Sequence, residues 1–203
     1  MSQLTELYDQ VRACEKCQLS QSRTLAVPGE GPEDARILFI GEAPGFHEDR
    51  QGRPFVGAAG QYLNELLAKV GLKREAVYIA NVIKCRPPGN RDPLPDEIAT
   101  CRTYLDRQID LLRPRLVVTL GRFSMERYFP GASISRIHGQ PKRVGSIIYY
   151  PVFHPAAALH QPRWKNLLDE DFARIPGLLG QLDQIEEQGD QSRPPQAEQL
   201  SLF

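Results

Sequence analysis

Four cysteines are the residues of this chain best suited to hold a metal. Cys14 and Cys17 form a close pair, whereas Cys85 and Cys101 stand far along the chain and are separated by a proline-rich stretch. Structural zinc sites usually combine two close pairs, and iron–sulfur clusters commonly combine one close pair with distant ligands. Cys101 also falls on an apolar helical stripe, where a free thiol packs as a small hydrophobe. Spacing alone therefore leaves a cluster, a zinc site and free thiols open.

The segment "GEAPGFHEDRQGRPFVGAAG", residues 41–60, combines a carboxylate, an aromatic ring and many small residues. Glu42 would place an acid beside a ligand, and Phe55 would offer that ligand a flat face for stacking. Gly41 and Ala43 are small enough for the backbone to approach it closely. The segment lacks the Gly-Lys-Ser/Thr of a phosphate-binding loop, which argues against a nucleoside triphosphatase. Taken singly, Glu42 is equally interpretable as a solvated loop acid and Phe55 as a core residue.

Two further polar residues are placed next to apolar segments. Asn81 lies within the run "VYIANVI", and His154 follows "IIYYPVF" directly before a proline. An unpaired buried amide costs about 1–3 kcal/mol, so Asn81 must pair with the backbone or with a ligand that offers a donor and an acceptor, such as a nucleobase edge. A lone histidine is more often structural than catalytic. The elements around both residues decide between these interpretations.

Apolar, β-branched runs predict four strands, at residues 36–40, 77–83, 115–120 and 147–153. The runs are mostly continuous rather than alternating, as in strands covered on both faces, and helical patterns separate them. The sequence therefore predicts an α/β fold of three layers, α/β/α, with a central four-stranded parallel sheet. Ligands bind at the carboxyl ends of such strands, so we expect Glu42, Asn81 and His154 to meet in one cleft.

The helical patterns lie between and after the predicted strands. Apolar stripes at helical spacing occupy residues 63–70 and 98–112, and a short helix is expected after Gly121. A C-terminal helical pattern contains Pro176, where we expect a kink.

The composition is that of an ordinary globular protein: 203 residues, of which 41% are hydrophobic and 25% charged. The N-terminal residues have no signal-peptide pattern, and no apolar run approaches the roughly 18 residues of a membrane span. We therefore expect a cytoplasmic protein with no membrane partner. Disulfides are then the least expected fate of the cysteines, because glutathione keeps cytosolic thiols reduced.

Charge and polarity divide the chain into two parts. Residues 183–203 hold five acids and one base, a net charge of −4, and the other 24 bases and 20 acids give residues 1–182 a net charge of +4. The mildly basic body is compatible with a polyanionic partner. We predict one domain over residues 1–183 and a disordered acidic tail over residues 184–203, which are too polar to bury a core.

Four motifs in this order resemble the family 4 uracil-DNA glycosylases: "GEAPGFHEDRQGRPFVGAAG", "NVIKCRPPGNRDP", "CRTYLDRQI" and "FHPA". The resemblance runs from the first cysteine pair to about residue 175. It implies the uracil-DNA-glycosylase fold, removal of uracil from DNA in base excision repair, and a [4Fe–4S] cluster held by the four cysteines.

The resemblance also implies a role for each residue of the expected cleft. Phe55 would stack on a uracil flipped out of the DNA, and Asn81 would read its Watson–Crick edge. His154 would hydrogen-bond the uracil oxygen on which negative charge develops. Glu42 would position or activate water, or stabilise the cationic sugar. Gly41 and Ala43 would bring the backbone close to the base.

The chain departs from the family pattern at Phe46 and His47, where many members carry acidic residues; we interpret His47 as a surface residue.

Candidate DNA contacts lie elsewhere. The segment "SRIHGQPKR" offers basic side chains to phosphates, and "HPAAALHQPRWK" offers an apolar wedge for the minor groove. These candidates are Arg136, Lys142, Arg143 and Leu159.

The last five residues, "QLSLF", form an apolar cluster after a long polar stretch. They resemble the short peptide by which bacterial DNA-repair and replication proteins bind the sliding clamp. Gln199 would set the register by hydrogen bonds, and the apolar side chains would enter pockets of the clamp: Leu200, Leu202 and Phe203. The alternative is a tail that folds back on the body. We expect the protein otherwise to be a monomer.

Two other functions stay open at this level. A non-catalytic binder of damaged bases would need Phe55 and Asn81 but not Glu42 with His154. An iron–sulfur redox or sensor protein would need the cysteines but not the cleft.

Overall fold

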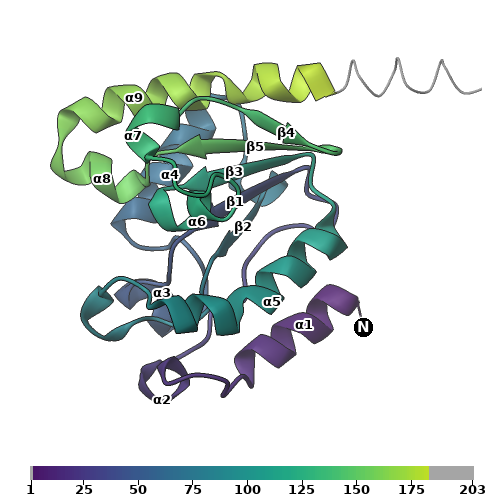
Figure 1. Ribbon diagram of the computed structural model, residues 1–203, viewed down its shortest axis with the longest axis vertical. Helices are drawn as coiled ribbons and strands as arrows, with labels where there is room; N and C mark the ends of the chain where they lie inside the picture. Colours follow the sequence, from purple (N-terminus) through teal and green to yellow (C-terminus); the bar gives the residue numbers. More distant parts are fainter. Residues whose placement is uncertain (1, 183–203) are drawn as a thin grey trace, which may run out of the picture.

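The computed structural model describes residues 2–182, except for the side chains of His160 and Pro162. Its centre is a five-stranded sheet with the strand order β2-β1-β3-β5-β4 (Figure 1). Four of these strands are mutually parallel: β1 (Ile37–Gly41), β2 (Tyr78–Asn81), β3 (Leu116–Leu120) and β5 (Ile147–Val152). The predicted four parallel strands are thus confirmed.

The prediction of a four-stranded sheet missed a fifth strand, β4 (Lys142–Val144), which pairs antiparallel with β5 at the sheet edge. All three β4 residues are exposed, so the strand lacks the apolar run by which the others were found. Gly145, at a φ of 60°, starts the two-residue turn that joins β4 to β5. In the sequence, β4 is indicated by a polar segment that directly precedes a Gly-Ser turn.

Helices cover both faces of the sheet (Figure 1). Alternate residues of β1 face opposite cores: Phe39 joins α4 and α9 on one side, whereas Leu38 joins α1 and α5 on the other. The Phe39 ring stacks on Phe172 of α9, with ring centroids 5.9 Å apart. Because each strand is buried on both faces, its sequence is continuously apolar, and the three-layer prediction is confirmed.

The predicted helical stripes correspond to the two long helices beside the sheet. The stripe at residues 63–70 falls in α4 (Ala58–Lys69) and on Val70, which directly follows it. The stripe at 98–112 falls in α5 (Pro95–Leu112), where Cys101 is buried. The Glu97 side chain caps α5 by accepting a hydrogen bond of 2.8 Å from the Leu94 N–H. The other labelled α-helices are α1 (Gln3–Arg12), α2 (Leu19–Ser22), α3 (Phe46–Gln51), α6 (Arg122–Glu126), α7 (Ile134–Ile137), α8 (Pro155–His160) and α9 (Pro162–Ala173). Two short 3₁₀ helices are η1 (Arg74–Ala76) and η2 (Pro88–Asn90).

The C-terminal helical pattern is interrupted where a kink was expected. Helix α9 ends at Ala173, Arg174 lies in a turn, and residues 175–182 are helical again. Pro176 stands in the first turn of this second segment. Backbone N–H groups in a first turn have no acceptor within the helix, so a proline there costs no helical hydrogen bond. Among the described helices, none has both the length and the apolar character to cross a bilayer. The predicted tail, residues 184–203, lies outside the described residues.

Candidate active site

The carboxyl ends of the strands surround a cavity of about 480 Å³. Its lining includes five of the residues singled out in the sequence: Glu42, Ala43, Phe55, Asn81 and His154. Glu42 follows β1, Asn81 ends β2, and His154 lies just beyond β5. Parallel pairing thus brings together side chains that are far apart in the sequence, as expected for such a sheet.

Gly41 lies behind this lining and is needed for its packing. A Cβ at this position would meet the Asn81 side-chain oxygen and approach the Phe55 ring to 2.6 Å. The glycine therefore lets the amide and the ring stand side by side against the end of β1.

Asn81 is an amide without an internal partner. The residue is only 1% exposed, and neither its side-chain oxygen nor its nitrogen has a hydrogen-bond partner among the residues that the structure describes. Its backbone carbonyl accepts a hydrogen bond of 2.9 Å from Lys84 Nζ, which also bonds Gln108 Oε1 at 2.7 Å. A buried, unsatisfied amide is destabilising, so its presence in a cavity wall indicates a ligand with a complementary donor and acceptor.

His154 offers a hydrogen-bond donor to the same cavity. Burial lowers the pKa of His154 to about 4, with the Glu48 carboxylate opposing this shift, so the ring is neutral at physiological pH. Its Nδ1 accepts a hydrogen bond of 3.1 Å from the Ala156 N–H at the start of α8. The ring proton must then reside on Nε2, which is the other imidazole nitrogen. The ring also stacks on Phe55, with centroids 5.6 Å apart.

Glu42 is the carboxylate at the end of β1. Burial raises its pKa, and the negative charge of Asp92 raises it further, while Arg122 acts in the opposite direction. Arg122 also forms an ion pair with Asp92. The second carboxylate that lines the cavity, Glu48, is engaged by the backbone, since its Oε1 accepts the N–H groups of Val56 and Gly57 at 2.9 and 2.8 Å.

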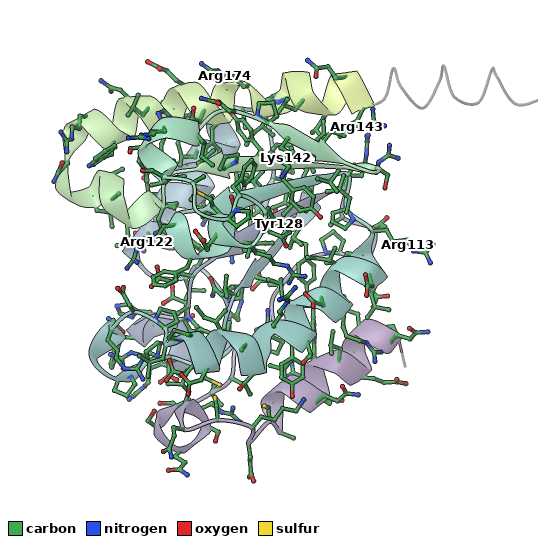
Figure 2. The ribbon with its side chains drawn as sticks, in the orientation of Figure 1. Arg113, Arg122, Tyr128, Lys142, Arg143 and Arg174 are labelled. Atoms are coloured by element: carbon green, nitrogen blue, oxygen red, sulfur yellow. The ribbon has the colours of Figure 1, made fainter. Side chains whose placement is uncertain are left out.

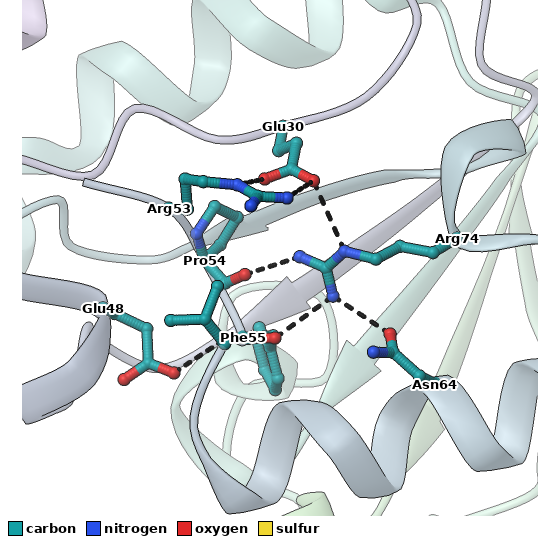
Figure 3. Close-up of polar contacts among 8 residues, drawn as sticks. Glu30, Glu48, Arg53, Pro54, Phe55, Asn64 and Arg74 are labelled. Atoms are coloured by element: carbon teal, nitrogen blue, oxygen red, sulfur yellow. Dashed lines mark hydrogen bonds and ion pairs between the residues drawn. The ribbon is translucent and has the colours of Figure 1, made fainter. Parts of the chain in front are cut away.

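Phe55 holds its ring in the cavity through an uncommon backbone conformation. Its φ is 51°, in the left-handed region that non-glycine residues seldom adopt, and a Cβ on Gly60 would collide with its carbonyl. Arg74 donates hydrogen bonds to the carbonyls of Phe55 and Pro54, at 3.1 and 2.6 Å (Figure 3). Arg74 also donates a hydrogen bond of 3.1 Å to Asn64 Oδ1, so the guanidinium clamps this loop to the middle of α4.

The four cysteines gather at one core between α1 and α5. Cys85 and Cys101 are buried there, and Cys14 and Cys17 pack against it with partial exposure. Cys85 Sγ accepts a hydrogen bond of 3.0 Å from Arg23, and Cys101 Sγ accepts one of 3.3 Å from the Lys84 backbone N–H. Burial raises the pKa of the Cys101 thiol to about 11, and Cys85 and Cys14 add to the rise.

This arrangement fits a group with thiolate ligands. N–H donors aimed at sulfur stabilise ligating thiolates in iron–sulfur sites. Within residues 2–182, no three cysteine, histidine or carboxylate side chains converge on a point where one metal ion would sit. Four cysteine thiols gathered in one core, with N–H donors at two of the sulfurs, are a donor set that an iron–sulfur cluster can use.

Comparison with known proteins identifies the family to which this chain belongs. The sequence model of the uracil DNA glycosylase superfamily matches residues 28–174. This chain belongs to that superfamily. It is 48% identical to a type-4 uracil-DNA glycosylase of Sulfurisphaera tokodaii over 88% of this chain and 86% of the relative. It is 44% identical to a type-4 uracil-DNA glycosylase of Archaeoglobus fulgidus over 89% of this chain and 95% of the relative.

The type-4 group is the better match within the superfamily. A type-5 uracil-DNA glycosylase of Thermus thermophilus is 35% identical over 68% of this chain and 69% of the relative. The predicted resemblance to family 4 uracil-DNA glycosylases is therefore confirmed.

The candidate DNA contacts of this uracil-DNA glycosylase homologue are dispersed. Lys142 and Arg143 lie on β4, and Arg143 pairs with Ile148, six residues before His154. At about 3.3 Å per residue this is roughly 20 Å from the cavity. Figure 2 shows Arg143 near the β4–β5 hairpin, across the molecule from Arg122. Arg136 is exposed on α7, and Leu159 is 45% exposed on α8, the helix that begins at the cavity. These DNA contacts remain predictions.

Sequence reasoning missed two supports of the cavity. Arg74 stands among charged residues before β2 and belongs to no motif, and Glu48 lies inside the first motif without an assigned role. The signal for Glu48 was its place three residues after Gly45, where its Oε2 accepts the Gly45 N–H at 3.1 Å. The sequence carries no signal for Arg74, whose hydrogen bonds to the Pro54 and Phe55 carbonyls are seen only in the folded protein.

We expect Arg74→Met to lower kcat/KM on a uracil-containing oligonucleotide by about 5- to 150-fold. A residue held in a sparsely populated φ region costs about 1–3 kcal/mol, and without the clamp the loop can relax and carry Phe55 out of the cavity. Steady-state kinetics well below the unfolding temperature would measure this effect.

Arg53→Met is the matched control, because Arg53 shares Glu30 with Arg74 but contacts neither carbonyl of the loop. Its side chain is 58% exposed, against 14% for Arg74. If Arg74 acts through Phe55, the double variant Phe55→Ala/Arg74→Met is no slower than Phe55→Ala alone. Additive losses would contradict the clamp.

Proposed function

We propose that this protein is a uracil-DNA glycosylase that flips uracil out of DNA and hydrolyses its N-glycosidic bond, leaving an abasic site for base excision repair. The observation that supports it most is the buried, unpartnered amide of Asn81 in the cavity wall, beside a stacking ring and a neutral histidine. Membership of the uracil-DNA glycosylase superfamily supports the same reaction.

Recognition depends on the flipped base. A uracil must leave the base stack before an enzyme can reach its glycosidic bond. In the cavity its face would stack on Phe55, and its Watson–Crick edge would meet Asn81. Uracil offers an N–H donor next to a carbonyl acceptor, which one amide can pair with in full. Cytosine reverses this pattern, so its amino group and ring nitrogen would leave Asn81 mispaired.

The bond between sugar C1′ and uracil N1 breaks with its electron pair passing to the base. Negative charge then develops on the uracil oxygen next to N1, where the His154 Nε2–H would donate a hydrogen bond. The sugar becomes cationic and takes up water at C1′, which releases a proton. Glu48 accepts two backbone N–H groups, whereas no backbone N–H group of the described residues donates to the Glu42 carboxylate. Glu42 would therefore face the sugar and this water. Gly41 and Ala43 would bring the backbone close to the base.

One incubation tests this function. The protein is mixed with an oligonucleotide that carries a single uracil, and alkali then cleaves the strand at any abasic site. We expect cleavage at the uracil and none at a cytosine in the same position. Tight binding without cleavage would instead identify a damaged-base binder. If the protein neither binds nor cleaves the oligonucleotide, the redox or sensor function is the alternative that stays open.

We propose that Cys14, Cys17, Cys85 and Cys101 hold a [4Fe–4S] cluster. Bound there, the cluster would join the segment after α1 to the loop after β2 and to α5, so its first role would be structural. Lys84 donates through its backbone to Cys101 and through its side chain to the Asn81 carbonyl. The cysteine core and the base-reading residue are therefore connected through one lysine.

We expect Cys85→Ala to lose iron, visible absorption and solubility together, because three ligands no longer hold the cluster and the loop after β2 loses its anchor. Iron and acid-labile sulfide analysis of the purified protein measures this. Arg12→Ala, an exposed change near the cysteines, should keep full iron content. Stoichiometric zinc without iron in the unmodified protein would contradict the proposal.

The remaining proposals concern partners and location. We propose a cytoplasmic monomer that acts on uracil-containing DNA and binds the bacterial sliding clamp through Gln199, Leu200, Leu202 and Phe203. These four residues lie outside the described part of the chain.

Deleting residues 199–203 should abolish binding to the clamp and leave excision from a free oligonucleotide intact. Equal clamp binding by the truncated protein would overturn the assignment.

A further inference from the structure

Phe46 is an aromatic side chain exposed at the edge of the cavity. It begins α3, it lines the cavity, and it is 50% exposed. The other large apolar side chains exposed within residues 2–182 are aliphatic and do not line the cavity: Leu25, Leu94, Val144 and Leu159. A half-exposed phenyl ring at the opening of a binding site is an apolar surface that a ligand can cover.

Positive charge surrounds this ring. The guanidinium of Arg86 lies 5.1 Å from the ring centroid and that of Arg50 lies 5.8 Å from it. The His47 ring is nearly perpendicular to the Phe46 ring, with the two centroids 5.5 Å apart. Arg86 Nε also donates a hydrogen bond of 2.7 Å to Asn90 Oδ1, another cavity residue. In the part of the chain that the structure describes, neither arginine forms an ion pair with a carboxylate.

An aromatic face with cations beside it has the chemistry of a single-stranded nucleic-acid site. A nucleobase stacks on an aromatic side chain with about 1–3 kcal/mol of stabilisation, and nearby arginines attract the phosphates. We propose that Phe46, with Arg50 and Arg86, is a stacking site for the nucleobase next to the flipped uracil in the same strand. This inference rests on the proposed function, since it needs a nucleotide in the cavity.

The position of Phe46 indicates the neighbouring base. Successive bases of a strand are close together, at about 3.4 Å along a helix axis, so the nucleotide next to a base held in the cavity must pass its edge. Extruding the uracil also uncovers one face of that neighbour, which loses its stacking partner. In single-stranded DNA the neighbour is unpaired as well, so the site should favour such substrates.

The test compares Phe46→Ala with the unmodified protein on a single-stranded oligonucleotide that carries one uracil. We expect KM to rise by about 5- to 150-fold, the equivalent of one lost base–aromatic stack. Phe46→Trp should retain the low KM because it keeps the ring face. Leu25→Ala is the matched control, because Leu25 is 45% exposed but does not line the cavity, and its KM should not change.

A second set of substrates identifies the contacted base. Replacing the flanking nucleotide on one side of the uracil by an abasic analogue should remove the difference between Phe46→Ala and the unmodified protein. If the difference persists with abasic analogues on both sides, or if Phe46→Ala has an unchanged KM, the stacking site is wrong. If the unmodified protein does not excise uracil at all, it is the proposed function that fails.

Discussion

Replacing His154 with alanine should lower kcat on a uracil-containing oligonucleotide by about 100- to 1,000-fold, the usual effect of removing one donor to a developing oxyanion. The reason is the tautomer: the Ala156 N–H occupies Nδ1, so the only ring proton points from Nε2. The donor is most valuable once the base carries charge, so KM should change much less than kcat. Single-turnover excision measures the loss directly.

His154→Gln is the informative comparison, because its amide can also donate a hydrogen bond and should recover part of the rate. An unchanged kcat in the alanine variant would remove His154 from the reaction. A rise in KM alone would assign it to binding.

The pH dependence separates His154 from Glu42. His154 has its pKa lowered to about 4, so no change in activity is expected near 6.5, the ordinary histidine pKa. Glu42 has its pKa raised by burial, and activity that needs its carboxylate is present above that pKa and is lost as the pH falls through it. The acid limb should therefore disappear in Glu42→Gln. An acid limb near pH 6.5 that persists in Glu42→Gln would contradict the neutral histidine.

Replacing Asn81 with aspartate should lower the ratio of kcat/KM for uracil to that for cytosine by about 30- to 20,000-fold. An ionised carboxylate only accepts hydrogen bonds, so it loses the donor to uracil and gains an acceptor for the cytosine amino group. Each changed hydrogen bond is worth about 1–3 kcal/mol, and the two changes act on the ratio together. Matched oligonucleotides with uracil or cytosine at one position measure it.

This experiment belongs at alkaline pH, because burial raises the pKa of a carboxyl group and a protonated carboxyl in the variant would keep a donor. Asn81→Ala is the control: it should lose uracil excision without gaining any on cytosine. Equal selectivity of the aspartate variant and the unmodified protein at alkaline pH would show that another group reads the base.

Much of the fold was readable from the sequence because the central strands are buried on both faces. Such strands must be continuously apolar, so the four parallel strands could be located in the sequence. The rule that ligands bind at the carboxyl ends of parallel strands then predicted that Glu42, Asn81 and His154 lie together. Strand β4 escaped because an exposed edge strand carries no such constraint. Its residues, Lys142–Val144, are polar or exposed and pair with β5 through the backbone alone.

The identity of the site residues came from the motifs, but their chemical states came from the tertiary structure. The tautomer of His154 depends on a hydrogen bond from the start of α8, and its pKa depends on burial. The unpartnered amide of Asn81 exists only because no neighbouring group in the described part of the chain reaches it. Burial and partner geometry are properties of packed neighbours, and no local pattern of residue types encodes them.

Motifs and the continuous apolar runs of buried strands were enough to predict the family, the parallel sheet, the residues of the cleft and the four cysteines. The tertiary structure was needed to reveal that Arg74 holds Phe55 in a left-handed conformation and that the exposed Phe46 ring has two arginines close to it at the cavity edge. Both arrangements join segments that the chain keeps apart, such as α3 with the loop after β2. Their energies come from contacts across space, which exist only once the sheet has brought its strand ends together.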